Sequence, residues 1–346
     1  MRVLQLGPYP PPNGGVQSNL VAIRDLLRAR GHWAGVVNLT RHRRQNGDDV
    51  YYPRTAGQVI RLLAGLRYDI LHLHVGGDIQ RRLLALAALS ARVPRAKTVL
   101  TFHSGGYPSS AAGRRARPQS VRGWVFRGFD RIIAVNQEIA RLFERFGVAA
   151  QRIRMIAPHA VPPLAGVAYP PALDAFLRAH RPLLLTVGLL EPEYDLPLQI
   201  EALNGIRARH PGAGLLLAGA GSLEAELRAR IASMPYAGHI LLWGDLPHAV
   251  TMRAMSECDA LLRTTLYDGD SIAVREALSM GTPVIATDNG MRPPGVRLIA
   301  AGDRPALEAA VLAELAAMSA ARPRRSPQAD HSNVEAVLAL YEDLIR

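Results

Sequence analysis

Short apolar, β-branched runs alternate with longer amphipathic segments along almost the whole chain of 346 residues. Alternation of this kind favours parallel sheets whose two faces are covered by helices. The expected strands are residues 3–6, 33–38, 70–73, 98–102, 131–135 and 154–156, then 183–187, 215–218, 240–243, 260–262, 283–286 and 296–299. The predicted fold class is therefore α/β, with two Rossmann-like units in tandem.

A cluster of prolines between residues 158 and 182 interrupts this alternation. Proline-rich segments that interrupt a regular pattern are typical of linkers between domains. We therefore predict an N-terminal domain over 1–160, a linker over 161–181 and a C-terminal domain over 182–325. Residues 326–346 are expected to contain a final amphipathic helix, for which packing back onto the N-terminal domain is one option.

Composition excludes several classes of protein. With 49% hydrophobic and 20% charged residues, a largely disordered or coiled-coil chain is excluded. The single cysteine, Cys258, rules out an internal disulfide or a cysteine-rich metal framework. The first apolar run stops at Gly7-Pro8, which is too short for a signal peptide, and no stretch reaches the ~18 apolar residues of a membrane span. We expect a cytoplasmic protein, peripheral at most on the inner membrane face.

The net charge of +12 is concentrated in the first half, because residues 1–160 carry +17 and residues 161–346 carry −5. Six arginines crowd one segment around Trp124, Val125 and Phe126: Arg114, Arg115, Arg117, Arg122, Arg127 and Arg131. Cations among exposed aromatics suit an anionic membrane surface. Nucleic acid is disfavoured because no nucleic-acid-binding motif accompanies the charge. A solvated face that only aids solubility is the remaining alternative.

Two glycines, Gly14 and Gly15, follow the first expected strand and open directly into a helix. They allow close approach of the backbone, and the helix N-terminus offers unpaired N–H groups to an anion. A plain structural turn is the alternative.

An acidic loop, Asp268-Gly269-Asp270-Ser271-Ile272, follows the expected strand 260–262 and leads into a helix that contains Glu276. Asp270 or Ser271 is expected to cap that helix, which leaves amides near Ile272 for a phosphate. Asp268 and Glu276 suit a polyhydroxylated ligand, because carboxylates accept strong hydrogen bonds from hydroxyls. The alternative is a capped surface helix with solvated acids.

Three histidines, His72, His74 and His103, end strands of the first half. No acidic partner supports a metal site, so none is expected, and His103 is interpreted as a polar contact to a sugar. His159 and His248 are interpreted as ordinary loop residues.

The run from Asp268 to Leu278, followed by Gly281-Thr282-Pro283, resembles the Glu-x7-Glu region of glycosyltransferase family 4. Those enzymes are retaining and have the GT-B fold, in which two Rossmann-like domains face each other across a cleft. Further matches cover nearly the whole chain: Gly14-Gly15, His103, Ala134-Val135-Asn136, Val187-Gly188, Gly219-Ala220-Gly221 and Gly244-Asp245-Leu246-Pro247.

The resemblance implies a site with catalytic residues His103, Asp268 and Glu276. The implied donor-binding residues are Gly15, Gly188, Gly219, Gly244, Leu246, Asp270, Ser271 and Ile272, and the implied acceptor-binding residues are Gly14, Gly15 and His103. Glu276 would bind ribose hydroxyls and Asp268 a sugar hydroxyl. The resemblance also implies a nucleotide-diphosphate sugar as donor, no other cofactor, no metal, and a glycan or lipid-linked acceptor.

The chain departs from the family where two cations usually hold the donor diphosphate. Leu189 stands in the arginine place and Tyr194 in the lysine place. Because a diphosphate in a binding site needs charge compensation, we predict a substitute cation, with Arg263 first and Arg292 second. A non-catalytic nucleotide-sugar-binding relative and a nucleotide-sugar epimerase remain open. So do the base, the sugar, the acceptor and the oligomeric state.

Overall fold

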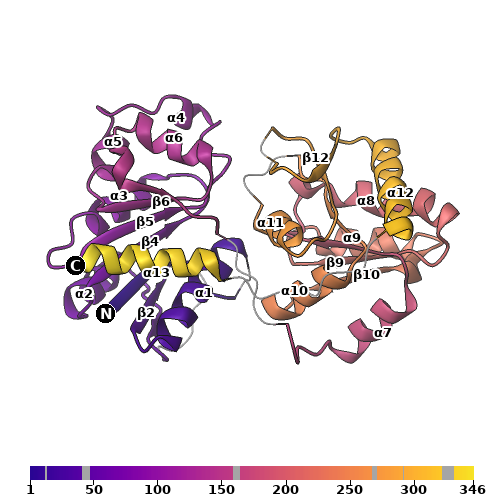
Figure 1. Cartoon of the computed structure of the whole chain (residues 1–346), viewed down its shortest axis with the longest axis horizontal. Helices are drawn as coiled ribbons and strands as arrows, with labels where there is room; N and C mark the ends of the chain where they lie inside the picture. Colours follow the sequence, from indigo (N-terminus) through magenta and orange to yellow (C-terminus); the bar gives the residue numbers. More distant parts are fainter. Residues whose placement is uncertain (12–13, 41–46, 159–163, 267–270, 291, 322–330) are drawn as a thin grey trace. The chain divides into compact units, whose positions relative to one another are not determined.

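The computed structural model describes residues 1–11, 14–40, 47–158, 164–266, 271–290, 292–321 and 331–346. The chain folds into two compact units (Figure 1). Unit 1 comprises Met1–Ala160 with His331–Arg346, and unit 2 comprises Val161–Asp330. Each unit is built on a parallel sheet with helices on both faces, so the predicted α/β class with two Rossmann-like units is confirmed.

The described part of unit 1 forms a seven-stranded sheet in the order β3-β2-β1-β4-β5-β6-β7. Its strands are β1 Arg2–Gly7, β2 Trp33–Asn38, β3 Val50–Tyr51, β4 Ile70–Val75, β5 Lys97–Phe102, β6 Arg131–Ala134 and β7 Ile153–Met155. Parallel neighbours end at the same edge, so the loops after β1, β4 and β5 lie together. The short strand β3, which pairs with β2 through Val36 and Val50, was not predicted.

Helices cover the two faces of this sheet. The helices of unit 1 are α1 Gly15–Ala29, α2 Ala56–Gly65, α3 Arg81–Ser90, α4 Ala111–Arg114, α5 Val121–Phe126, α6 Gln137–Arg145 and α13 Ser332–Ile345, with a 3-10 turn η1 Ala150–Arg152. The C-terminal helix α13 lies beside α1 on one face (Figure 1), where Val337 and Tyr341 pack against Ile23 and Leu27. Helices α2, α3, α5 and α6 contribute to the core on the opposite face. Among the described ranges, no helix is both long and apolar enough to cross a bilayer.

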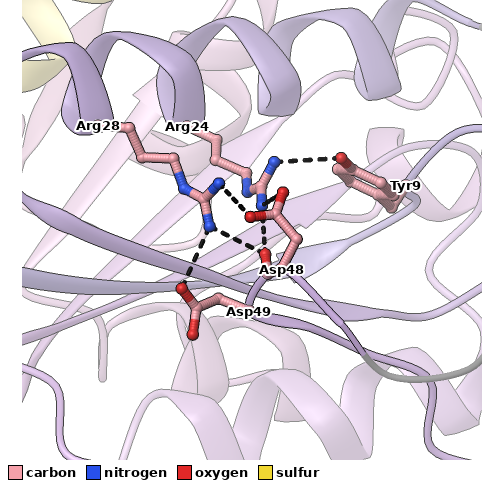
Figure 2. Close-up of polar contacts among 5 residues, drawn as sticks. All are labelled: Tyr9, Arg24, Arg28, Asp48 and Asp49. Atoms are coloured by element: carbon pink, nitrogen blue, oxygen red, sulfur yellow. Dashed lines mark hydrogen bonds and ion pairs between the residues drawn. The ribbon is translucent and has the colours of Figure 1, made fainter.

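Part of the basic charge of unit 1 is neutralised inside the unit. Figure 2 shows Arg24 and Arg28 of α1 turned toward Asp48 and Asp49, which precede β3. Arg28 Nη1 lies 2.6 Å from Asp48 Oδ1, and Arg24 Nη2 lies 2.7 Å from Asp48 Oδ2. Hydrogen bonds from Arg24 and Arg28 lower the pKa of Asp48 to about 2. These two arginines therefore hold the turn before β3 against α1 rather than facing an anionic partner.

The described part of unit 2 forms a six-stranded parallel sheet in the order β10-β9-β8-β11-β12-β13. Its strands are β8 Leu183–Val187, β9 Gly214–Ala218, β10 Ile240–Gly244, β11 Ala260–Arg263, β12 Val284–Thr287 and β13 Val296–Ile299. One face carries α7 Pro171–Ala179, α10 His248–Glu257 and α11 Ile272–Ser279, and the other carries α8 Leu196–Arg209, α9 Glu224–Ala232 and α12 Arg304–Ala321. Two 3-10 turns complete the unit, η2 Pro192–Tyr194 and η3 Ala237–His239.

The segment expected to be a linker, 161–181, contains helix α7. Leu173 and Leu177 of α7 are buried in the core of unit 2, together with neighbouring residues of the segment. From residue 164 on, this segment is therefore part of the packed fold. Proline is tolerated there because Pro171 occupies the first turn of α7, where its missing N–H has no helical partner to lose.

Candidate functional site

Three of the predicted donor-binding glycines lie together at the carboxyl edge of unit 2. Gly188 follows β8, Gly219 follows β9 and Gly244 ends β10, and these strands are neighbours in the sheet. Gly188 N donates to Ala218 O at 3.0 Å, and Gly219 N donates to Gly244 O at 2.8 Å. A Cβ on Gly219 would lie 1.7 Å from Gly188 O, and Gly219 has a φ of +145°. Glycine is required at this position for the loops to approach so closely.

Arg263, the first predicted substitute cation, ends β11 beside these glycines. Its Nη1 donates to Val187 O at 2.9 Å, and its guanidinium lies 4.5 Å from the centroid of the Tyr194 ring. A Cβ on Gly188 would lie 2.8 Å from Arg263 Nη1. The side chain is buried, so the guanidinium is held by Val187 and Tyr194 at the end of β8. The fold thus brings a cation to the edge where Leu189 is exposed.

Arg292, the second predicted cation, follows the neighbouring strand β12. Its Nε donates to Thr287 O at 3.0 Å, and its Nη2 donates to Thr265 Oγ1 at 2.6 Å. Thr265 follows β11, so Arg263 and Arg292 come from the ends of adjacent strands. Two guanidinium groups therefore lie at the same edge of the sheet as the three glycines.

Glu276 is buried in α11 and hydrogen-bonded to His248. The distance from His248 Nε2 to Glu276 Oε1 is 2.8 Å, and the Glu276 side chain is 6% exposed. The interpretation of His248 as an ordinary loop residue was wrong, because it begins α10 and contacts the predicted ribose-binding carboxylate. The sequence signal that could have placed His248 at the site was its position directly after Gly244-Asp245-Leu246-Pro247, a segment that matches the family.

The start of α11 carries the described part of the predicted phosphate site. Ser271 is the N-cap, and its Oγ accepts a hydrogen bond from Val274 N at 3.4 Å. Ile272 is the first helical residue. Asp268 and Asp270 lie outside the described residues, as does His159. Leu246, expected near the base, is buried in the apolar core of unit 2.

The predicted acceptor-binding residues lie at one edge of unit 1. Gly14 is the N-cap of α1 and supplies no side-chain cap, so α1 begins at Gly15. A Cβ on Gly76 would lie 3.1 Å from Val16 Cγ2, which places the end of β4 against the first turn of α1. His103 N donates to Val75 O at 2.7 Å. The end of β4 therefore links the glycine turn to His103.

The three strand-end histidines pack against one another within unit 1, His72 against His74 and His74 against His103. His72 contacts Tyr341 OH through Nδ1 and Thr101 Oγ1 through Nε2, the latter at 2.7 Å. Burial lowers the pKa of His72 and of His103 to about 3, so both are neutral near pH 7. In the part of the chain that the structure describes, no group of three or more His, Cys, Asp or Glu residues is arranged to hold a metal ion.

Comparison with known proteins gives a consistent result over both units. A family model described as glycosyltransferase family 4 matches residues 13–159, and one described as glycosyl transferases group 1 matches residues 175–297. A phosphatidyl-myo-inositol mannosyltransferase of Mycolicibacterium smegmatis is 27% identical over 318 residues, covering 83% of this chain and 76% of the relative.

Solved structures share the fold over almost the whole chain. Anabaena HepE in complex with UDP-glucose superposes with a TM-score of 0.66 at 16% identity, covering 100% of this chain and 98% of that one. A glycosyltransferase from Rickettsia africae superposes with a TM-score of 0.67 at 15% identity, with the same coverage. At these identities the likeness shows the fold alone.

Proposed function

This chain belongs to the glycosyltransferases of family 4 and has their GT-B fold, and from that premise we propose that it transfers a sugar from a nucleotide-diphosphate donor to an acceptor with retention at the anomeric carbon. The observation that carries the proposal is the buried Glu276 carboxylate, which is paired with His248 on the sheet face next to the glycine edge. A buried carboxylate needs hydrogen-bond donors, and ribose hydroxyls supply them.

The donor is assigned to unit 2. Glu276 accepts hydrogen bonds from ribose hydroxyls, and the amides at Ser271 and Ile272 bind the distal phosphate at the N-terminus of α11. Arg263 and Arg292 take the place of the missing cation pair and compensate the diphosphate charge. Asp268 remains the predicted contact to a sugar hydroxyl. HepE, which binds UDP-glucose, has the same fold, which supports a nucleotide sugar as donor.

The proposed reaction needs no metal ion, because Arg263 and Arg292 supply the positive charge that compensates the diphosphate. As the glycosidic bond breaks, negative charge grows on the leaving diphosphate while the sugar becomes oxocarbenium-like. Preorganised donors aimed at that oxygen stabilise the transition state more than the ground state. Guanidinium groups held in place by Val187, Tyr194 and Thr265 provide such donors without a metal ion.

The acceptor is assigned to unit 1, with Gly14, Gly15 and His103 as its contacts. The named mannosyltransferase relatives act on phosphatidyl-myo-inositol, which supports a lipid-linked acceptor here. Arg114, Arg115 and Arg117 are exposed, and Trp124 is 54% exposed.

We propose that this basic face, defined as Arg114, Arg115, Arg117 and Trp124, contacts an anionic membrane surface on the cytoplasmic side. The expectation of further exposed apolar residues was wrong for Val125 and Phe126, which are buried in the core of unit 1. Trp124 alone therefore supplies the aromatic contact in this face.

The test is a thermal-shift panel of UDP, GDP, ADP and their sugar conjugates, because a ligand that binds the native state raises its apparent stability. One nucleotide should raise the melting temperature, and its sugar conjugate should then support transfer to a lipid acceptor. Binding without turnover would favour a non-catalytic relative. Interconversion or release of the donor without a glycosylated acceptor would favour an epimerase. No shift with any nucleotide would overturn the donor assignment.

A further inference from the structure

A series of buried polar contacts leads from the backbone of α1 to His103. Gln5 Nε2 donates to Leu20 O at 3.3 Å, and His74 Nε2 lies 3.0 Å from Gln5 Oε1. His74 Nδ1 then lies 3.5 Å from His103 Nε2, with the two rings 5.7 Å apart between centroids and tilted by 21°. Gln5 and His74 are buried, so water does not compete for these contacts.

The proton positions along this series follow from which atoms are able to donate. A backbone carbonyl only accepts, so the amide nitrogen of Gln5 faces Leu20 and its oxygen faces His74. That oxygen also only accepts, so the proton of His74 sits on Nε2. Burial, with His72 and His103 close by, lowers the pKa of His74 well below its ordinary value, so this ring carries one proton. His74 Nδ1 is therefore bare.

The bare nitrogen of His74 requires a donor, and His103 Nε2 is the atom that it faces. His103 is neutral as well, so a proton on Nε2 leaves Nδ1 without one. In the reverse order, His103 Nδ1 would hold the proton and His74 Nε2 would turn a lone pair toward the lone pairs of Gln5. Every contact therefore has one donor and one acceptor only when both His74 and His103 carry their proton on Nε2.

His103 Nδ1 has no hydrogen-bond partner among the described residues, although it is a buried atom. Buried polar atoms in native structures almost always have a partner, so an orphan at a predicted site points to a missing ligand group. With its lone pair free, this nitrogen accepts from a hydroxyl. It repels an atom that only accepts, such as a phosphate or carboxylate oxygen.

We propose that Gln5 and His74 are positioning residues that hold His103 in the tautomer with a bare Nδ1, so that His103 accepts a hydrogen bond from a hydroxyl of the sugar or acceptor. The proposal rests on the proposed function in that it places His103 at the reacting groups. It adds that His103 acts as an acceptor at neutral pH and not as a proton-donating acid. It also selects a hydroxyl-bearing ligand group over an anionic one at this position.

The test is long-range ¹H–¹⁵N correlation NMR of the full chain with ¹⁵N-labelled histidine at pH 7, with the His103→Asn spectrum to assign His103. The expected spectrum shows a protonated Nε2 and a bare Nδ1 for His103. Gln5→Met removes the acceptor that orients His74, so the His103 signals should move toward a mixture of tautomers. Gln199→Met removes a buried glutamine of unit 2 that bonds Thr186 and Thr264, and should leave His103 unchanged.

A wild-type His103 with its proton on Nδ1 would overturn the proposal, even if Gln5→Met did not fold. A folded Gln5→Met variant with an unchanged His103 tautomer would overturn it too. Nucleotide binding by Gln5→Met should equal wild type, because the donor is assigned to unit 2. A failure of the donor assignment appears as absent nucleotide binding and leaves the tautomer result untouched.

Discussion

His248 Nε2 lies 2.8 Å from Glu276 Oε1 and joins the first residue of α10 to the middle of α11. A carboxylate at neutral pH only accepts, so His248 carries a proton on Nε2. In the described part of the chain, His248 is the hydrogen-bond partner of the Glu276 side chain, and it engages Oε1 alone. In the proposed site we therefore expect Oε2 to accept from the ribose, with the carboxylate held by His248 at Oε1.

Replacing Glu276 with alanine should weaken nucleotide binding by about 5- to 150-fold, because a hydrogen bond to a buried charged group contributes about 1–3 kcal/mol. Isothermal titration with the nucleotide found in the thermal-shift panel measures this. Glu314→Ala is the matched control, since Glu314 pairs with Arg297 in the same unit on a helix outside the site. Equal affinity in wild type and a folded Glu276→Ala variant would remove the ribose contact from the site.

Replacing Arg263 with alanine should weaken nucleoside-diphosphate binding by about ten- to a hundredfold, because a charge-assisted hydrogen bond to phosphate contributes about 1.5–3 kcal/mol. Binding of the bare nucleoside, which has no phosphate, should change little. The comparison of the two ligands separates lost charge from local unfolding at Val187 and Tyr194. If Arg263→Ala and Arg292→Ala both keep diphosphate affinity, neither arginine replaces the missing cations.

A methyl group at Gly219 should destabilise unit 2 by about 3 kcal/mol or more, since its Cβ would lie 1.7 Å from a backbone oxygen and its φ is +145°. Urea denaturation followed by fluorescence, in a background with Trp33→Phe and Trp124→Phe that retains Trp243, reports on unit 2. Gly238→Ala is the matched control, because nothing lies within 4 Å of its Cβ, and its stability should stay within about 1 kcal/mol of wild type. A Gly219→Ala variant as stable as Gly238→Ala would contradict the close approach of the two loops.

Acid should destabilise unit 1 below pH 6.5. The folded-state pKa values of His72 and His103 are about 3, below the unfolded value near 6.5, so the unfolded state binds more protons between these limits. Stability is therefore constant above about pH 6.5 and falls as the pH drops, by about 2 kcal/mol for each buried histidine at pH 5. Urea midpoints of a Trp243→Phe variant, which retains Trp33 and Trp124 in unit 1, measure this at pH 7 and pH 5. Equal midpoints would show that these histidines titrate normally.

Serine at Arg114, Arg115 and Arg117 together should reduce binding to anionic vesicles by about a hundredfold, because each cation near the surface contributes about 1 kcal/mol. Binding should also weaken with salt, which screens exposed charges beyond about 8 Å at physiological strength. Co-sedimentation with phosphatidylserine and phosphatidylcholine vesicles measures both effects.

The matched control for this face is the triple variant Arg178→Ser, Arg228→Ser and Arg304→Ser, which removes the same charge from exposed sites of unit 2. It should bind vesicles like wild type. If wild type binds neither vesicle, the basic face only aids solubility. Equal binding to both vesicle types would exclude the electrostatic contact.

The sequence predicted the central strands well because β4, β5, β8 and β9 are largely buried, mostly apolar runs bounded by turns, whereas the edge strands β7 and β13 are more exposed and each contains an arginine. Strand β3 was not predicted, because its two residues, Val50 and Tyr51, are too few to show an alternating pattern of apolar and polar side chains. Helix α7 escaped because the prolines around it were interpreted as a linker, although Pro171 opens the helix and Leu173 and Leu177 are spaced to bury one face.

The places of Gly188 and Gly219 after strands, and of Glu276 in the helix that follows β11, were predictable because each matches a family pattern, and their ligand contacts stay predictions. Hydrogen-bond partners that only the tertiary fold brings together were not predictable from the sequence. His248 and Glu276 are 28 positions apart, and Gln5 and His74 are 69 apart. A single glutamine in an apolar strand gives no local sign of the ring that it will face.

Helix α13 completes unit 1 from the far end of the chain, and this imposes an order on folding during synthesis. Unit 2 is contained entirely within residues that leave the ribosome before α13 does. Unit 1, begun first, must wait for Val337 and Tyr341 to cover Val3, Ile23 and the strands behind them. Until then α1 covers only part of this apolar sheet face, and the nascent chain exposes the rest, a surface of the kind that chaperones bind.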